Sequence, residues 1–323
     1  MSKINGKYGN SCSAREAPSV TEYLIGTGGW AYFNASDKPT LSEYSRFFNF
    51  VEVNYTFYNY PSHKMVENWR RMAPKDFTFT VRCNRDLTHR AGLRCVDETY
   101  EVFDKMLSVC RILEAPFLHL ETPSSYVFDK LSLAEARQFF STVCSKGIRL
   151  AWELRNPITK EAKNLMQDFN IVHSVDLSRF EPSSDSDTVY TRLFGKGKHN
   201  VYQFVDEEMV DIDQRIAKLQ ARRVIMSFHG LRMNTDALRF KQYKESGVFP
   251  SATSFTGADS ARSVLSEDAK FPSKRDELIE DQGWKVIDLT TNKRVHLSEL
   301  LSTIPERTYD SLDEVIQAFE GRI

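Results

Sequence analysis

Short strand-like runs alternate with amphipathic helical runs from residue 23 to about residue 245. Eight of the strand-like runs are mostly apolar and rich in β-branched or aromatic residues, which is typical of strands covered on both faces. These eight runs are Tyr23–Gly26, Phe50–Asn54, Thr78–Arg82, Phe117–Leu120, Arg149–Glu153, Val172–Val175, Val189–Leu193 and Val224–Phe228. Most are followed by a segment whose apolar residues recur every three or four positions, as in DETYEVFDKMLSVCRIL. The pattern predicts a parallel α/β sheet whose strands are joined through helices.

Two architectures share this local pattern, the (β/α)8 barrel and the open doubly wound sheet. Open sheets of the second kind usually carry a GxGxxG loop after the first strand, and a helix begins on that loop. Here the first strand is followed by GTGGWAYF, which lacks that spacing and is not followed directly by a helical pattern. We therefore predict a TIM-type (β/α)8 barrel. One irregular connection is expected, because the segment RFEPSSDSD between the sixth and seventh strands reads as a polar loop.

The chain is expected to divide into four parts. Residues 1–21 form a polar leader, residues 22–247 the barrel, residues 248–268 a linker and residues 269–323 a small helical C-terminal module. The linker is predicted because FPSATSFTGADSARSVLSED interrupts the alternation with small polar residues. The C-terminal module is short and poor in core residues, so we expect it to dock on the barrel and to be a candidate surface for a protein partner.

Composition excludes several classes of protein. The 323 residues are 41% hydrophobic and 27% charged with a net charge of −1, which argues against binding nucleic acid or acidic membranes through global charge. A local basic cleft is still compatible with that balance. We expect no membrane association, since no apolar run is long enough to span a bilayer and the N-terminus lacks the apolar core of a secretory signal. The five cysteines form no CxxC pair, so we expect a reduced, cytoplasmic protein without a cysteine zinc site.

Several strings carry a resemblance to a known family. They are IGTGGWAY, then FVEVNYTFYNYPS followed by a tryptophan, APKDFTFTVRCNRDLTH, LAWELRNP on the fifth strand and YTRLFGKG on the seventh. Over about residues 22–245 the chain resembles the domain-of-unknown-function 72 (YecE-like) family. The resemblance implies a barrel, in agreement with the alternation, and leaves the reaction open.

The chain departs from the pattern of that family at three places. The family typically carries a histidine–glycine pair on the seventh strand, where this chain has Phe194 before a glycine. It typically ends the eighth strand in a phenylalanine and two asparagines, where this chain has Phe228 and His229, and it has a lysine at the position of Arg82. If the family acts through those groups, the departures imply a shifted specificity or a lost activity.

Catalytic groups of barrels gather at the carboxyl ends of the strands, where the loops converge. This chain places acids, bases, cations and aromatic rings at those positions. They are Trp30, Tyr32, Glu52, Asn54, Arg82, Arg85, His89, Glu121, Glu153, Arg155, Asp176, Arg192, Lys196 and His229. Because side chains alternate along a strand, Glu52 shares a face with Asn54, and Glu153 shares one with Arg155. Both pairs are expected to point into the top of the barrel.

Cations beside aromatic rings suit a substrate that carries phosphates and flat rings. Our leading hypothesis is therefore an enzyme that hydrolyses a phosphate-bearing substrate, a nucleotide or a nucleic acid, at the barrel mouth. Arg82, Arg155 and Arg192 would hold the anion, and Trp30 would form a stacking wall. Tyr32, Asn54 and Lys196 complete the expected substrate-binding set.

Glu153, His89 and Glu52 are the catalytic candidates. Glu153 ends a strand, where a carboxylate can serve as a general base or a metal ligand. His89 lies among arginines, and these should lower its pKa and favour the neutral imidazole. Glu52 has an alternative role, because a carboxylate inside a barrel can be the structural partner of an arginine.

Three other interpretations stay open. A divalent metal is a candidate cofactor, with Glu121, Asp176 and His229 as candidate ligands beside Glu153. A sugar-acting enzyme would use Glu52 and Glu153 as paired carboxylates. A non-catalytic binding module would use the acids only to balance the arginines, and the family departures favour this third interpretation.

Overall fold

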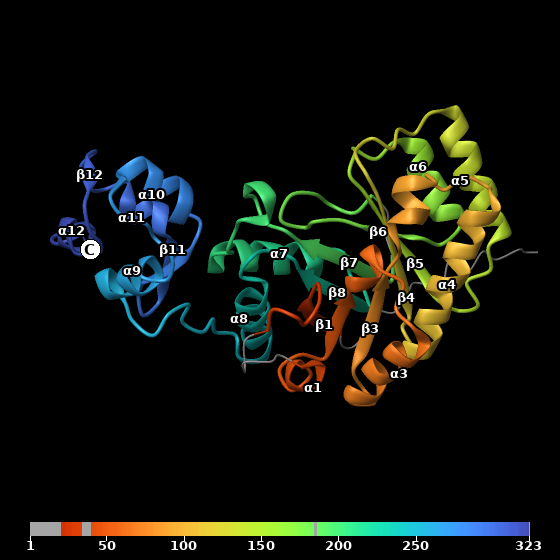
Figure 1. The fold of residues 1–323 in the computed structure, drawn as a ribbon, viewed down its shortest axis with the longest axis horizontal. Coiled ribbons are helices and arrows are strands. Elements are labelled where there is room, and N and C mark those ends of the chain that lie inside the picture. The colour runs from red at the N-terminus through yellow and green to blue at the C-terminus, as the bar shows by residue number, and fades with distance from the viewer. Residues whose placement is uncertain (1–20, 34–39, 184–185, 323) are drawn as a thin grey trace, which may run out of the picture.

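Eight parallel strands form a nearly closed barrel (Figure 1). The structure is a computed structural model that describes residues 21–33, 40–183 and 186–322, so nearly all of the expected leader lies outside the described residues. The strands are β1 (Glu22–Thr27), β2 (Phe50–Val53), β3 (Thr78–Arg82), β4 (Phe117–Thr122), β5 (Arg149–Leu154), β6 (Val172–Ser174), β7 (Thr188–Leu193) and β8 (Arg223–Phe228). β1 pairs with both β2 and β8, and a bridge between Val175 and Thr191 joins the ends of β6 and β7. All eight predicted strands are confirmed, and so is the barrel.

Helices surround this barrel. They are α1 (Leu41–Tyr44), α2 (Tyr55–Tyr58), α3 (His63–Met72), α4 (Asp97–Leu113), α5 (Lys130–Thr142), α6 (Lys160–Asp168), α7 (Asp206–Lys218) and α8 (Met233–Ser246). Local signals set several of their ends: Ser62 caps α3, Thr159 caps α6, and Gly247 ends α8 in the left-handed conformation with φ 75°. The connection from β6 to β7 contains no helix among its described residues, as the polar loop predicted.

Alternation along each strand separates two cores. On β5, Leu150 and Trp152 face outward and pack with residues of the helices, whereas Ala151 and Glu153 face the barrel interior. The interior has an apolar layer toward the amino ends of the strands, made of Leu24, Phe50, Phe117, Ala151, Val172, Tyr190 and Ile225. The next inward positions along the strands are mostly polar or charged. The barrel therefore changes from an apolar floor to an ionic mouth.

The C-terminal unit is more than a helical module. It contains α9 (Gly257–Leu265), α10 (Arg275–Gln282), α11 (Leu297–Leu301) and α12 (Leu312–Ala318), with the hairpin β10 (Val286–Thr290) and β11 (Lys293–His296). Two shorter strands, β9 (Ser273–Lys274) and β12 (Thr308–Tyr309), also pair. The segment 248–268, which we expected to be a linker, contains α9, because Ala261, Val264 and Leu265 pack in the core of this unit. The unit thus begins earlier than the composition indicated.

Polar contacts join the C-terminal unit to the barrel next to α7 (Figure 1). Asp206, at the start of α7, accepts from Arg294 at 2.7 Å and also pairs with the buried Arg239 of α8. The side-chain oxygen of Gln203 accepts from the backbone N–H of Val286 at 2.9 Å. The backbone carbonyl oxygen of Gln203 lies 2.7 Å from Nε2 of His296. The unit is therefore held against the loop that connects β7 to α7.

Candidate functional site

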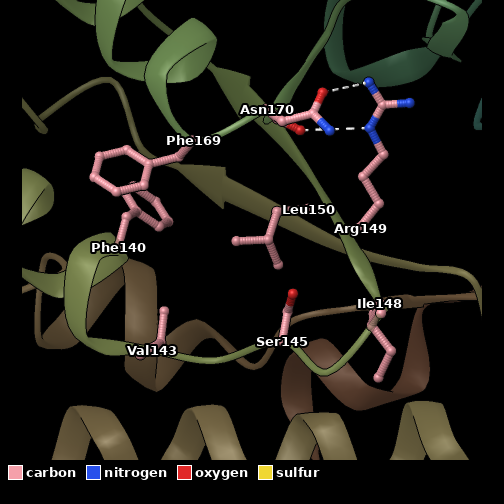
Figure 2. A pocket seen from close by; sticks show the side chains of 9 residues that line it. Phe140, Val143, Ser145, Ile148, Arg149, Leu150, Phe169 and Asn170 are labelled. Atoms are coloured by element: carbon pink, nitrogen blue, oxygen red, sulfur yellow. Dashed lines mark hydrogen bonds between the residues drawn. The ribbon is translucent and has the colours of Figure 1, made fainter.

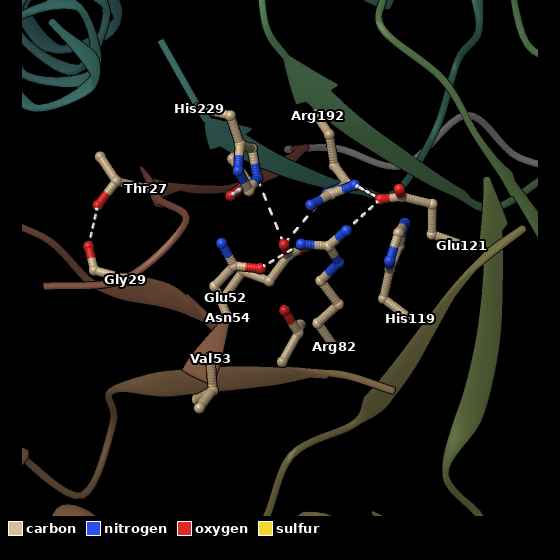
Figure 3. Close-up of polar contacts among 12 residues, drawn as sticks. Thr27, Gly29, Glu52, Val53, Asn54, Arg82, His119, Glu121, Arg192 and His229 are labelled. Atoms are coloured by element: carbon tan, nitrogen blue, oxygen red, sulfur yellow. Dashed lines mark hydrogen bonds and ion pairs between the residues drawn. The ribbon is translucent and has the colours of Figure 1, made fainter. Parts of the chain in front are cut away.

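Five charged side chains from five strands meet at the carboxyl end of the barrel, and Figure 3 labels all of them except Glu153. They are Glu52 on β2, Arg82 on β3, Glu121 on β4, Glu153 on β5 and Arg192 on β7, and each is at most 7% exposed. Each side chain points inward for the same reason, because a residue two positions from an interior residue shares its face of the strand. Alternation thus turns all five charges toward the interior of the barrel.

Arg192 is the centre of this ion cluster. Its Nη1 donates at 2.6 Å to Glu121 and at 2.6 Å to Glu153, and its Nε donates to Glu52 at 3.1 Å. Tyr190, two residues earlier on β7, donates its hydroxyl to Glu52 at 2.7 Å. A guanidinium that is 1% exposed needs such partners, since a buried charge without them is strongly destabilising.

Arg82 and a sixth residue, Arg155, complete the ion cluster. Arg82 donates from Nη2 to Glu121 at 2.7 Å and from Nη1 to Asn54 at 2.6 Å. Arg155 lies above the carboxylates, with Nη2 3.2 Å from Glu121 and Nη1 3.1 Å from Glu153. The side chain of Arg155 is 38% exposed, whereas that of Arg82 is 8% exposed. Three carboxylates therefore face three guanidinium groups, and solvent reaches Arg155 most easily.

The three carboxyl groups differ in acidity. Burial opposes ionisation of Glu52, but Arg192 together with His229 and His119 outweighs it, and the pKa of Glu52 lies well below its usual range. Burial also opposes ionisation of Glu121, and the three arginines together lower its pKa. Burial raises the pKa of Glu153, the neighbouring Glu121 raises it further, and Arg192 only partly offsets the two. Glu153 is therefore the carboxyl that holds a proton most readily.

Two neutral histidines border the ion cluster. Burial, assisted by the charge of Arg192, lowers the pKa of His229 to about 4 even though Glu52 lies 3.3 Å from its Nε2. Burial likewise lowers the pKa of His119 well below its usual range. His119 contacts Oγ of Ser174 at 3.1 Å through Nε2, and its Nδ1 has no partner among the described residues. Sequence reasoning missed His119, although FLHLET puts it on the same face as Glu121.

The imidazole of His229 is fixed on two sides by rings and backbone. It stacks on the ring of Phe194 with 4.9 Å between centroids and an angle of 27°. On the other side it lies against Gly28, where an added Cβ would come within 2.3 Å of the imidazole. The backbone N–H of Phe194 donates to Asp176 at 3.0 Å, which fixes the start of the β7–α7 loop. These contacts hold His229 beside Glu52.

The other predicted site residues lie on the rim. His89 is exposed, its ring packs edge-on against Phe57 at 5.1 Å, and its pKa is lowered by partial burial and, as expected, by Arg82 and Arg155. Trp30 is half-buried against Trp69, and Tyr32 is 77% exposed. Lys196 pairs with Glu208 at 2.8 Å rather than with the ion cluster. These groups do not converge on one point.

Two of the expected anion ligands need correction. Arg192 and Arg82 were expected to hold a substrate anion, but both are buried and both already donate to carboxylates. Their role in this structure is to hold Glu52, Glu121 and Glu153. Glu52 is likewise 0% exposed, so its alternative role as a structural partner of arginine is the one that the geometry supports.

The candidate metal ligands are not brought together. Glu121 pairs with arginines, Asp176 accepts from Ser178 and Phe194, and His229 contacts Glu52. In the described part of the chain, no group of three or more His, Cys, Asp or Glu side chains is placed to hold a metal ion. No helix of that part is long and apolar enough to cross a membrane.

A cavity of about 450 Å³ lies at the other end of β5, away from the ion cluster (Figure 2). Phe140, Val143, Leu150 and Phe169 give it an apolar wall. Its main polar group, Arg149, donates to the side-chain oxygen of Asn170 at 2.9 Å and is engaged by further partners. The charged residue that lines this cavity is therefore already paired.

Comparison with known proteins gives the family. A family model described as "Protein of unknown function DUF72" matches residues 24–248, which run from within β1 through the rest of the barrel strands. This chain belongs to the DUF72 family. A shorter match of 64 residues is 38% identical to the UPF0759 protein YecE of Escherichia coli strain K12, and an equal match is found in strain O157:H7. That match covers 20% of this chain and 24% of the length of each YecE relative.

Solved DUF72 structures have the same fold. A DUF72 family protein from Thermotoga maritima MSB8 is 19% identical with a TM-score of 0.58, and the likeness covers 70% of this chain and 100% of that one. A DUF72 family protein from Enterococcus faecalis V583 is 17% identical with a TM-score of 0.55, covering 71% and 96% of the two chains. At these identities the likeness supports the barrel architecture alone. Within the barrel, two departures noted in the sequence, Phe194 and His229, are stacked on each other.

Proposed function

We propose that the barrel mouth is the active site of a hydrolase-type enzyme that acts on a phosphate-bearing substrate. Glu153 is the proton donor and acceptor, and Arg155 binds the anion. The observation that carries the proposal is the contrast between Glu121 and Glu153. The two are direct partners in the register of β4 and β5, yet the pKa of Glu121 is lowered and that of Glu153 is raised. Two neighbouring carboxyl groups whose pKa values are shifted in opposite directions suit acid–base chemistry.

Arg155 is the arginine best suited to meet a substrate. Its side chain is 38% exposed, and it lies 3.1 Å from a carboxylate oxygen of Glu153. A phosphate group held on the outer face of this guanidinium would lie beside the carboxyl that exchanges the proton. His89, whose lowered pKa favours the neutral imidazole, is a second candidate for proton transfer at the rim.

A non-catalytic binding module is the second candidate. The balance of three carboxylates against three arginines favours it, because a compensated cluster attracts an anion only weakly. A paired-carboxylate sugar enzyme built on Glu52 has less support, since Glu52 is 0% exposed and bonded to Arg192 and Tyr190.

Thermal shift and turnover measurements test the proposal together. Inorganic phosphate should raise the Tm of the parent, and Arg155→Ala should remove the shift. Arg223→Ala is the matched control, because Arg223 is 40% exposed and pairs with Glu22 at the opposite end of the barrel. Hydrolysis of bis(p-nitrophenyl) phosphate should fall at least a hundredfold in Glu153→Gln. Binding without turnover in the parent would favour the binding module, and a phosphate shift that persists in Arg155→Ala would overturn the assignment of the anion site.

A further inference from the structure

Three tyrosines are exposed on one short segment beside the mouth. Tyr55, Tyr58 and Tyr60 are 42%, 58% and 45% exposed, whereas Thr56 and Phe57 between them are buried. The segment directly follows β2, so it lies at the carboxyl end of the barrel. A single exposed aromatic residue needs no explanation, but three within six positions at the mouth suggest a surface that binds a ligand.

Cations lie directly beside these rings. The guanidinium of Arg85 lies 5.9 Å from the ring centroid of Tyr58, and within the described ranges it forms no ion pair. Lys105 lies 5.7 Å from the ring of Tyr60. Two acids are also present, and a basic group compensates each: Asp86 accepts from Tyr60 at 2.9 Å and pairs with Arg90 at 3.1 Å, and Glu101 pairs with Lys105 at 3.8 Å, which leaves Arg85 as the excess cation. The local charge is therefore positive in a chain whose net charge is −1.

A continuous line of contacts links this tyrosine surface to the ion cluster. The guanidinium of Arg82, which is bonded to Glu121, lies 3.6 Å from the ring centroid of Phe57. Phe57 in turn packs against Tyr58 with 4.8 Å between ring centroids. The tyrosine surface, with Arg85 unpaired among the described residues, therefore adjoins the ion cluster in which Arg155 and Glu153 would hold one unit of a polymer.

We propose that the surface formed by Tyr55, Tyr58, Tyr60 and Arg85 binds single-stranded nucleic acid. This inference rests on the proposed function and names its substrate as a polymer rather than a free nucleotide. Flat bases stack on exposed rings, and phosphates pair with the cations between them. A duplex hides the faces of its bases, a polysaccharide without acidic groups gives the arginine no partner, and an acidic peptide lacks a series of flat rings. Single strands therefore match both features of the surface.

Binding of a fluorescein-labelled oligothymidylate to the full chain tests the inference. In anisotropy titrations Tyr58→Ala should weaken binding roughly tenfold, whereas Tyr58→Phe, which keeps the ring, should bind like the parent. Arg85→Ala should also weaken binding roughly tenfold and reduce the slope of log K against log salt concentration by about 0.7, the change expected for one lost phosphate contact. Matched controls are Phe255→Ala, 54% exposed in the C-terminal unit, and Arg222→Ala, exposed at the amino end of β8.

The outcomes separate this inference from the proposed function. Equal binding by the parent, Tyr58→Ala and Arg85→Ala would overturn the inference, as would equal affinity for a duplex or a neutral polysaccharide. If the protein binds phosphate through Arg155 but does not bind the oligonucleotide, the proposed function stands and the inference of a polymeric substrate is overturned. A third outcome is oligonucleotide binding that requires Tyr58, together with turnover that is absent or unaffected by Glu153→Gln. That outcome would support nucleic-acid binding by the tyrosine surface and exclude the proposed hydrolysis.

Discussion

Glu121 and Glu153 accept hydrogen bonds from the same nitrogen of Arg192, each at 2.6 Å. The register of β4 and β5 places the two residues directly opposite each other, so their carboxyl groups leave adjacent strands on the same face. One guanidinium nitrogen cannot neutralise two carboxylates fully. Arg155 lies near both of them, whereas Arg82 pairs with Glu121. The geometry therefore leaves Glu153 as the less stable anion.

Glutamine substitutions at Glu52 and Glu153 should have different effects on stability. Glu52→Gln removes a carboxylate whose pKa Arg192 lowers strongly, so the free energy of unfolding should fall by roughly 1–3 kcal/mol. Glu153→Gln removes a carboxylate that burial and Glu121 destabilise, so stability should change by less than about 1 kcal/mol or rise. Urea denaturation at pH 7 compares the two. A loss in Glu153→Gln as large as that in Glu52→Gln would rule out the catalytic assignment of Glu153.

A methyl group at position 28 should disturb His229. The added Cβ of Gly28→Ala would lie 2.3 Å from the imidazole, so the ring must leave its place beside Phe194 and Glu52. Overpacking of this kind lowers stability by about 1–3 kcal/mol. His229→Ala removes the clash, so Gly28→Ala should lower the free energy of unfolding much less in a protein that already carries His229→Ala. A double-mutant cycle measured by denaturation checks this, and strictly additive effects would contradict the contact.

The low pKa of His229 should make stability fall in acid. Its pKa is about 4 in the folded protein against an ordinary value of 6.5. Between these values the unfolded chain binds a proton that the folded protein does not, so stability decreases as pH falls from about 6.5 to about 4. His229→Asn should remove a dependence worth about 3 kcal/mol over that window.

A second histidine contributes in the same window. Burial lowers the pKa of His173 to about 4, so His229→Asn should flatten the pH dependence only in part. The double variant with His173→Asn should flatten it further. The measurement is the free energy of unfolding in urea at several pH values. An unchanged slope in His229→Asn would show that this imidazole is not buried as the structure has it.

The barrel should fold without the C-terminal unit. Among the described residues, Phe249 is the last that belongs to the barrel core, and the buried core of the C-terminal unit begins at Ala261. A chain that ends at Ser251 loses the contact of Arg294 with Asp206, yet Asp206 keeps Arg239 as a partner. We expect a monodisperse protein with cooperative thermal unfolding, followed by circular dichroism. Aggregation would instead mean that the C-terminal unit covers part of the barrel that cannot face water.

The location and chemical character of the site were predictable, but the roles of its arginines were not. Alternation placed Glu52 and Glu153 inside the barrel, because a period of two is a local property of a strand. Nothing local shows which of Arg192 and Arg155 other charged groups will cover, since both lie at or near the carboxyl end of a predicted strand. In the structure Arg192 is a buried partner of three acids, whereas Arg155 stays partly exposed to solvent.

The C-terminal unit shows the same limit at the level of secondary structure. Its strands are two to five residues long, too short for a period to be read reliably, and its first helix lies in a segment rich in serine and threonine. Ala261, Val264 and Leu265 belong to a core only because hairpin β10–β11 and α12 pack beside them. The polar composition of this segment therefore predicted a linker where the structure has α9.

The sequence by itself determined the barrel, its eight strands and the end at which the charges gather, because hydrophobic periodicity and turn residues act over a few neighbouring positions. The tertiary structure decided which charges meet. Strand register paired Glu121 with Glu153, and barrel closure brought Arg192 of β7 to Glu52 of β2. These contacts join residues 32 and 140 positions apart. They set the acidity of each carboxyl through burial and charge, and no local pattern contains that information.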